Sequence, residues 1–291
     1  MKSAQRNPRS DSRPHNPSVA FREFVEGRYW PSASATLSPV WAETVEQYHL
    51  PTLLDAFGTS PLTAIDPEQI ERWWGTLRRG TLAAATANKL LFRLKHVFKK
   101  AVEWGYLVEN PARGIRKSRE PRGRVKWLTD AQRDVLVQRA NPDLRLYLVA
   151  AQYTGARRRS LLELREQDVD FERSTVTFRA TKNGDDYSVP LHPKLSEVLR
   201  ARLTGQPEAY LLPRYTAGAL SRAFKRLAVR SGLTDYRFHD LRHDLASRLA
   251  CHGANQRLIM DVLGHRDPRA SVRYTHLSHG AIKQTMEACL A

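Results

Sequence analysis

The chain has 291 residues, of which 41% are hydrophobic, and its 47 Lys and Arg against 30 Asp and Glu give a formal net charge of +17. It has no apolar run long enough to span a membrane, no N-terminal apolar stretch of a signal peptide, and two cysteines, so we exclude a membrane protein or disulfide scaffold and expect a cytoplasmic protein. Its length favours two domains, and its positive charge favours a polyanionic partner, most simply nucleic acid.

The first half of the chain has a helical pattern that follows a polar N-terminus. Residues 1–17 are basic, rich in proline and almost without apolar side chains, which predicts a disordered basic tail. One helix begins after Asp66 as N-cap, with Pro67 at its first position and Gln69 completing a capping box. The longest apolar periodicity, at spacings of three and four, predicts a helix over 84–104. We therefore expect a helical domain over 18–112.

Basic side chains recur along the 84–104 helix, and a basic segment without periodicity follows it at 113–126. A charged stripe alone is usually a solvated surface. The segment 113–126, however, also has the proline, glycine and charge content of an exposed linker between domains, and we expect it to lie along phosphates. The DNA contacts that we predict in this half are Lys89, Arg93, Lys100, Arg116, Lys117 and Arg122.

A second domain over 127–291 begins where Thr129 and Gln132 form another capping box. Helices continue to about residue 164. Alternating segments at 168–171, 175–181 and 187–191, with the turn Asn183-Gly184, then predict a small antiparallel sheet. Further helices are predicted at 193–203, 217–231, 239–251, 255–263 and 279–290. The fold class is therefore mainly α with a small antiparallel β-sheet.

The helix predicted at 217–231 has an apolar face and a basic face. Arg222, Lys225 and Arg226 lie on the basic face, where they could serve solubility alone. We interpret them as contacts to DNA phosphates or base edges.

Four short strings in the second domain carry groups suited to phosphate chemistry. They are Thr154-Gly155-Ala156-Arg157, Thr181-Lys182-Asn183-Gly184, His239-Asp240-Leu241-Arg242-His243, and Leu263-Gly264-His265 followed nine residues later by Tyr274. Arginines donate forked hydrogen bonds to phosphate oxygens, and a phenol that attacks phosphorus forms a covalent phosphodiester. His239 and His243 could also bind zinc with His265 or His252, but no Glu or Cys at a familiar ligand spacing completes such a set, and we expect no metal.

In this order and at these separations, the strings resemble those of the tyrosine recombinases, the phage integrase family, from about residue 21 to residue 276. The resemblance implies a helical SAM-like core-binding domain joined by the 113–126 linker to an α/β catalytic domain, the two closing around duplex DNA. It also implies six catalytic residues and no cofactor. These residues are Arg157, Lys182, His239, Arg242, His265 and Tyr274.

The resemblance also implies a role for each of these residues. Tyr274 attacks the phosphate and leaves a 3′-phosphotyrosyl bond, while Lys182 protonates the departing 5′-oxygen. The two arginines stabilise the phosphate charge. His265 bonds a non-bridging oxygen, and His239 takes the tyrosine proton.

Two positions depart from the family pattern. Ser160 stands where the family commonly has an acidic residue, a change that could pass the orientation of Arg157 to Glu163, and Asp244 stands where it usually has Ser or Thr.

Other functions remain open at this point: a DNA-binding accessory protein or repressor without chemistry, and an activity like that of type IB topoisomerases. As a recombinase the chain is expected to act as a tetramer on DNA. We expect the 279–290 helix to dock on a neighbouring protomer, the alternative being its own domain.

Overall fold

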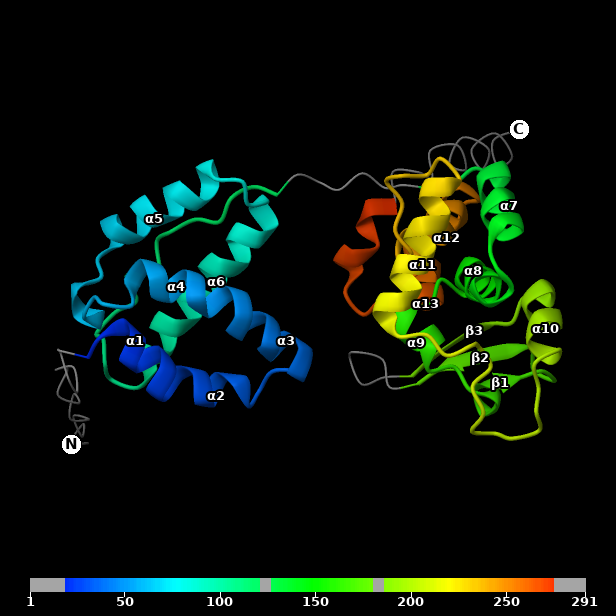
Figure 1. Ribbon diagram of the computed structural model, residues 1–291, viewed down its shortest axis with the longest axis horizontal. Helices are drawn as coiled ribbons and strands as arrows, with labels where there is room; N and C mark the ends of the chain where they lie inside the picture. The colour runs from blue at the N-terminus through cyan, green and yellow to red at the C-terminus, as the bar shows by residue number, and fades with distance from the viewer. Residues whose placement is uncertain (1–18, 121–126, 180–185, 275–291) are drawn as a thin grey trace, which may run out of the picture. The chain divides into compact units, whose positions relative to one another are not determined.

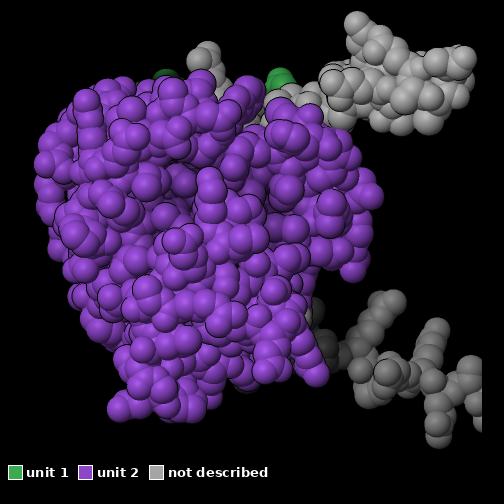
Figure 2. All heavy atoms as spheres, turned by 90° about the vertical axis from the view of Figure 1, so that its right-hand side faces the viewer, with its two compact units in different colours: residues 1–122 green, residues 123–291 purple. Residues whose placement is uncertain are grey.

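The computed structural model describes residues 19–120, 127–179 and 186–274. Contacts divide the chain into unit 1, residues 1–122, and unit 2, residues 123–291, which Figure 2 colours separately. Each unit is described by itself. The predicted basic tail and C-terminal helix, together with Arg122 and Lys182, lie outside the described residues.

The regular elements in the described part of unit 1 are all helices, joined by irregular segments (Figure 1). Its segments are α1 (Phe21–Phe24), η1 (Val25–Tyr29), α2 (Trp30–Ser34), α3 (Pro39–Thr44), η2 (Val45–His49), α4 (Leu50–Phe57), η3 (Leu62–Ala64), α5 (Pro67–Arg79) and α6 (Ala84–Glu103). The predicted N-cap is confirmed, since Asp66 Oδ1 accepts a hydrogen bond of 2.7 Å from the Gln69 amide. The apolar face of α6 supplies much of the core, where the Phe98 ring packs against that of Phe21 at 5.7 Å.

More residues of the segment that follows α6 pack on unit 1 than the basic composition of that segment suggests. Ile115 is buried in the core of this unit, and Trp74 Nε1 donates to the Arg116 carbonyl at 3.1 Å. The amide of Asn88 bonds both the N–H and the C=O of Ser118, at 2.8 and 2.9 Å. The first part of the expected 113–126 linker is thus attached to unit 1, while the Arg116 and Lys117 side chains stay exposed.

Unit 2 combines helices with one small sheet, as the sequence predicts. Its segments are α7 (Asp130–Arg139), α8 (Pro142–Thr154), α9 (Arg158–Leu162), η4 (Glu166–Asp168), β1 (Val169–Asp170), β2 (Thr175–Phe178), β3 (Tyr187–Pro190), α10 (Pro193–Arg200), α11 (Ala217–Arg230), α12 (Asp240–Cys251), α13 (Gln256–Leu263) and η5 (Pro268–Ala270). The strands are antiparallel in the order β1-β2-β3, with Val176 opposite Val189, and lie beside α10 (Figure 1). The capping box of Thr129 and Gln132 at α7 is confirmed.

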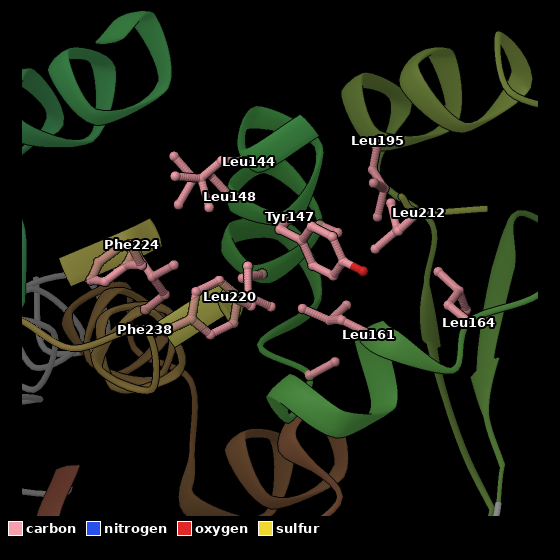
Figure 3. Close-up of a cluster of buried hydrophobic side chains, with 14 of the residues drawn as sticks. Leu144, Tyr147, Leu148, Leu161, Leu164, Leu195, Leu212, Leu220, Phe224 and Phe238 are labelled. Carbon is pink, nitrogen blue, oxygen red and sulfur yellow. The ribbon is translucent and has the colours of Figure 1, made fainter. Parts of the chain in front are cut away.

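The main core of unit 2 gathers around α8. Figure 3 shows Tyr147 of α8 at the centre of a cluster that includes leucines of α8, α9 and α10. Its hydroxyl donates to the Pro213 carbonyl at 2.7 Å, and burial raises its pKa to about 12. This tyrosine is a packed and hydrogen-bonded part of the core. Its contacts fix the position of α8, the helix that precedes Arg157.

The departure at Asp244 has a structural explanation. This carboxylate is fully buried on α12, where its Oδ1 accepts from the Leu128 amide at 2.8 Å and from Arg133 Nη1 at 3.0 Å. Arg133 also donates to the Leu128 carbonyl at 2.6 Å. Asp244 therefore joins the first described residues of unit 2 to the helix that carries the second arginine string.

Asp244→Ala is expected to lower the free energy of unfolding of unit 2 by about 3 kcal/mol, because the buried Leu128 amide and the Arg133 guanidinium both lose an acceptor. Urea denaturation followed by circular dichroism measures the change. Asp261→Ala is the control, since Asp261 pairs with Arg257 on an exposed helix face and its loss is expected to change stability by less than about 0.5 kcal/mol. Equal effects of the two substitutions would contradict the assignment.

Candidate active site

The Arg242 guanidinium is held by backbone carbonyls at the ends of two helices. Arg242 is 4% exposed, and it donates to the carbonyl of Gly155 at 2.8 Å and to that of Leu263. Gly155 ends α8 and Gly264 ends α13, each in the left-handed conformation, with φ of 60° and 59°. Because helix C-termini carry unpaired carbonyls and partial negative charge, they stabilise a buried cation at this place.

Arg157 also bonds a carbonyl at the C-terminal end of α13. Its Nη2 donates to the Gly264 carbonyl at 3.4 Å, and the side chain is half-buried. Burial, followed by the charge of Arg157, lowers the pKa of Arg242 to about 10, still high enough for a full charge at neutral pH. In residues 127–179 and 186–274, neither guanidinium forms an ion pair with a carboxylate, so the charge of both remains available to an anion.

The hypothesis that Glu163 orients Arg157 in place of an acidic residue at Ser160 is wrong. The Glu163 carboxylate follows α9 and accepts a hydrogen bond of 3.5 Å from the Tyr210 hydroxyl. The Gly264 carbonyl is the group that bonds Arg157. In the described structure, a backbone carbonyl therefore contacts Arg157 where the sequence predicts a carboxylate.

Tyr274 lies in the interior of unit 2 and bonds a histidine. Only 1% of it is exposed, and its hydroxyl forms a hydrogen bond with Nδ1 of His243. Burial raises the pKa of Tyr274, and the charges of Arg273 and Arg242 offset part of that increase. Burial, followed by the effect of His239, lowers the pKa of His243 to about 4. At neutral pH, therefore, a neutral phenol meets a neutral imidazole.

The two predicted histidines lie near this pair. His265 Nδ1 bonds the hydroxyl of Ser271 at 2.7 Å, and burial, followed by the charges of Arg242 and Arg157, lowers its pKa to about 4. His239 is exposed at the start of α12, where its ring packs edge-on against that of His243 with centroids 5.1 Å apart. His239 thus lies next to the partner of Tyr274.

Sequence reasoning missed two contributors to this site. From the sequence, His243 is named as the last residue of a string and as a possible zinc ligand. Its place directly after Arg242 is the feature that could have indicated a part in this site. Tyr187 of β3 packs against Gly264, where an added Cβ would lie 2.8 Å from the ring. Burial raises the pKa of the Tyr187 hydroxyl and the adjacent Arg242 partly lowers it, which places this phenol beside the arginine pair.

The predicted DNA contacts differ in their exposure. Arg93 is buried, and its Nη1 donates to the Tyr29 hydroxyl at 2.9 Å, so the prediction that it contacts DNA is wrong. Lys100 is half-buried and pairs with Glu103 at 2.7 Å. The predicted contacts with exposed side chains are Lys89, Arg116, Lys117, Arg222, Lys225 and Arg226.

Two other expectations concern metals and membranes. Among the described residues, no group of three or more His, Cys, Asp or Glu side chains is placed to hold a metal ion. No helix within those residues has the length and apolar character needed to cross a membrane.

A mainly helical fold of two units, with a buried tyrosine and two arginines that form no ion pair within the described residues, is the arrangement expected of a DNA recombinase of the tyrosine class. The model of the phage integrase family matches residues 126–280, and the chain belongs to that family. It is a tyrosine-type site-specific recombinase, as its sequence predicts. It is 26% identical over 259 residues to the integrase of Mycobacterium phage L5, an alignment that covers 79% of this chain and 69% of that protein.

Solved structures share the fold. The Tn1549 transposon integrase in complex with transposon right end DNA is 18% identical, with a TM-score of 0.77 over 94% of this chain and 100% of that one. A lambda integrase tetramer bound to a Holliday junction is 21% identical, with a TM-score of 0.72 over 87% of this chain and 80% of that one.

Proposed function

We propose that this recombinase cuts and rejoins duplex DNA through a 3′-phosphotyrosyl intermediate formed by Tyr274, with Arg157 and Arg242 binding the scissile phosphate. The observation that carries the proposal is the arginine pair. Both guanidinium groups are held by carbonyls, neither is neutralised by a carboxylate of the described residues, and Arg242 is close enough to Tyr274 for its charge to lower the pKa of that phenol. Forked donors with uncompensated charge fit the oxygens of a phosphodiester.

In the proposed cleavage step, Tyr274 Oη bonds to phosphorus while the bond from phosphorus to the 5′-oxygen breaks. Charge that develops on the non-bridging oxygens is stabilised by Arg157, Arg242 and His265, and losing one such donor typically costs about 100- to 1000-fold in rate. Lys182 gives a proton to the departing 5′-oxygen. Attack by a 5′-hydroxyl of another strand reverses the step, and because the phosphodiester bond energy is retained, the reaction needs no nucleotide cofactor.

The arginine pair also explains why a buried tyrosine can react. A phenol with a pKa of about 10 is ionised to only about one part in a thousand at pH 7, and burial of Tyr274 makes ionisation harder still. The free site therefore holds its nucleophile protonated. A proton acceptor next to the hydroxyl and positive charge from Arg242 are both needed for attack.

We propose double-stranded DNA as the partner in the cytoplasm, bound through the exposed basic side chains of both units. Strand exchange between two duplexes requires four protomers if each cleaves one strand, so we propose a tetramer on DNA. The lambda integrase tetramer on a Holliday junction supports this assembly. Docking of the 279–290 segment on a neighbouring protomer belongs to the same proposal and concerns residues outside those described.

The alternatives are a DNA-binding accessory protein or repressor without chemistry and a topoisomerase-like enzyme. A library of nicked duplexes with randomised sequence, incubated with the full chain and recovered after denaturation, selects the DNA that becomes covalently attached. Mass spectrometry of the digested adduct is expected to place the nucleotide on Tyr274. Sequence-specific binding that yields no adduct would support the accessory protein, and relaxation of supercoiled DNA without strand exchange would support the topoisomerase.

Binding to the selected duplex is expected to weaken steeply with salt. Arg116 and Lys117 are exposed on the segment that leaves unit 1, so replacing both with Gln is expected to flatten the slope of log K against log[salt] by up to about two. Fluorescence anisotropy between low and moderate salt measures the slope. Arg173→Gln, in the exposed turn before β2, is the matched control and is expected to leave the slope unchanged. An unchanged slope in the double variant would mean that this segment does not touch phosphates.

A further inference from the structure

We propose that His243 is a catalytic residue of this recombinase, the group that accepts the proton of Tyr274 during cleavage and returns it during ligation. This inference rests on the proposed function, in which Tyr274 is the nucleophile. It makes His243, the last residue of the string that contains Arg242, the proton acceptor, whereas the sequence resemblance gives that role to His239.

Geometry favours His243 over His239. The Nδ1 atom of His243 is hydrogen-bonded to the Tyr274 hydroxyl, the atom that loses its proton. His239 lies one helical turn earlier, is exposed, and packs edge-on against the ring of His243. A proton acceptor must lie within hydrogen-bond reach of the proton that it takes, or be separated from it by one water. In this structure His243 meets that requirement directly.

The protonation state of His243 also suits the role. Its lowered pKa of about 4 keeps the imidazole neutral at physiological pH, so one ring nitrogen carries a lone pair. In the tautomer of His243 whose ring proton is on Nε2, Nδ1 accepts a hydrogen bond from the Tyr274 hydroxyl. That tautomer has the donor and acceptor arrangement that proton transfer requires, and it is the one that the proposal assigns to the free enzyme.

Substrate binding would then make the transfer easier. Burial is the largest cause of the low pKa of His243, and the nearby His239, Arg273 and Arg242 lower it further, while Asp240 acts in the opposite direction. A phosphate bound between Arg157 and Arg242 adds negative charge close to the imidazole. Negative charge favours the protonated ring, so the basicity of His243 rises when the scissile phosphate is in place. Proton transfer is thereby linked to the presence of DNA.

The step balances without any further reactant. The bond from Tyr274 Oη to phosphorus forms, the bond from phosphorus to the 5′-oxygen breaks, and the phenolic proton moves to His243 Nδ1. The departing 5′-oxygen takes its proton from Lys182. In ligation the 5′-hydroxyl attacks phosphorus and returns its proton to Lys182, the phosphotyrosyl bond breaks, and the proton on His243 returns to Tyr274.

The test compares two substrates. The first is a nicked duplex on which covalent complex formation is followed in a single turnover. The second is a strand that ends in a 3′-p-nitrophenyl phosphate, which the enzyme joins to a 5′-hydroxyl. Here p-nitrophenolate leaves as a stable anion, so the joining reaction uses the arginines and Lys182 and needs no proton from a histidine.

The informative variant is His243→Asn, because its amide can still hydrogen-bond Tyr274 and cannot take up a proton. Cleavage is expected to fall about 100-fold or more, while joining of the p-nitrophenyl strand is expected to recover to within about threefold of the unsubstituted enzyme. His239→Asn is expected to affect cleavage less. His252→Asn, at the exposed end of the same helix, is the matched control and is expected to behave like the unsubstituted enzyme.

Three results would overturn the inference: cleavage by His243→Asn at a normal rate, an equal loss on both substrates, or a selective loss of cleavage in His239→Asn instead. Thermal unfolding of each variant distinguishes an equal loss caused by misfolding from an equal loss in a folded protein. If His243→Asn is misfolded, His243→Gln replaces it in the same assay. The proposed function is tested separately with Tyr274→Phe. A covalent complex formed by this variant would overturn the role of Tyr274 as nucleophile, whatever the identity of the proton acceptor.

Discussion

Tyr274→Phe is expected to form no covalent complex with a nicked duplex that carries the cognate site. The substitution removes the hydroxyl that attacks phosphorus and leaves both arginines in place, so affinity for the duplex is expected to stay within about twofold, equivalent to about 0.4 kcal/mol. Denaturing gel electrophoresis measures the adduct, and fluorescence anisotropy measures binding. The two measurements separate chemistry from recognition.

Tyr210→Phe is the matched control for that experiment. Tyr210 also has a hydroxyl in unit 2, but it contacts Arg165 and Glu163 at a distance from the arginine pair. Its loss is expected to leave adduct formation unchanged. An adduct that persists in Tyr274→Phe would show that another residue is the nucleophile.

Gly155→Ala is expected to destabilise unit 2 by about 2–5 kcal/mol. The residue has a φ of 60°, a conformation that costs roughly 1–2 kcal/mol for a residue with a Cβ. The added Cβ would also lie 2.7 Å from a methyl group of Leu263 and 2.9 Å from one of Leu245, and overpacking of that kind typically costs about 1–3 kcal/mol. Thermal and urea denaturation measure the loss. DNA binding is expected to weaken as well, because the Gly155 carbonyl holds Arg242.

Gly232→Ala separates the two contributions. Gly232 also has a positive φ, 74°, but nothing lies within 4 Å of the position that its Cβ would take. It is therefore expected to show the conformational cost alone, about 1 kcal/mol. If Gly155→Ala were no more destabilising than Gly232→Ala, the close approach of α8 to α12 and α13 would not matter for stability.

The local rules of helix and strand formation make most of the fold predictable from the sequence. The caps at Asp66 and Thr129 depend on the contact of a side chain with the next turn of the chain. The small sheet follows from alternation and turn residues. These signals involve neighbours in sequence, so no knowledge of the tertiary structure is needed to read them. Three of the four strings, those with Arg157, Arg242 and the pair of His265 and Tyr274, similarly predict groups that the described structure brings together.

The errors concern contacts between distant residues. Arg93 has the same spacing as exposed basic residues of α6, but Tyr29, 64 residues earlier, turns out to be its partner in the interior. Ile115 is an apolar residue in a strongly basic segment, and its burial attaches the first part of that segment to unit 1. The bond between His243 and Tyr274 depends on how α12 lies against the chain that follows η5. Periodicity predicts which face of a helix is buried, but it does not identify the residues of other segments that contact that face.

The carbonyl support of the arginine pair has a consequence for the energetics of the free enzyme. A buried and a half-buried guanidinium lie close together, and among the described residues no carboxylate forms an ion pair with either of them. The repulsion between Arg157 and Arg242 is relieved when an anion enters, so the phosphodiester completes a polar cluster that the folded chain leaves electrostatically incomplete. On the proposed function, DNA binding is therefore expected to stabilise unit 2 against unfolding as well as to supply the substrate.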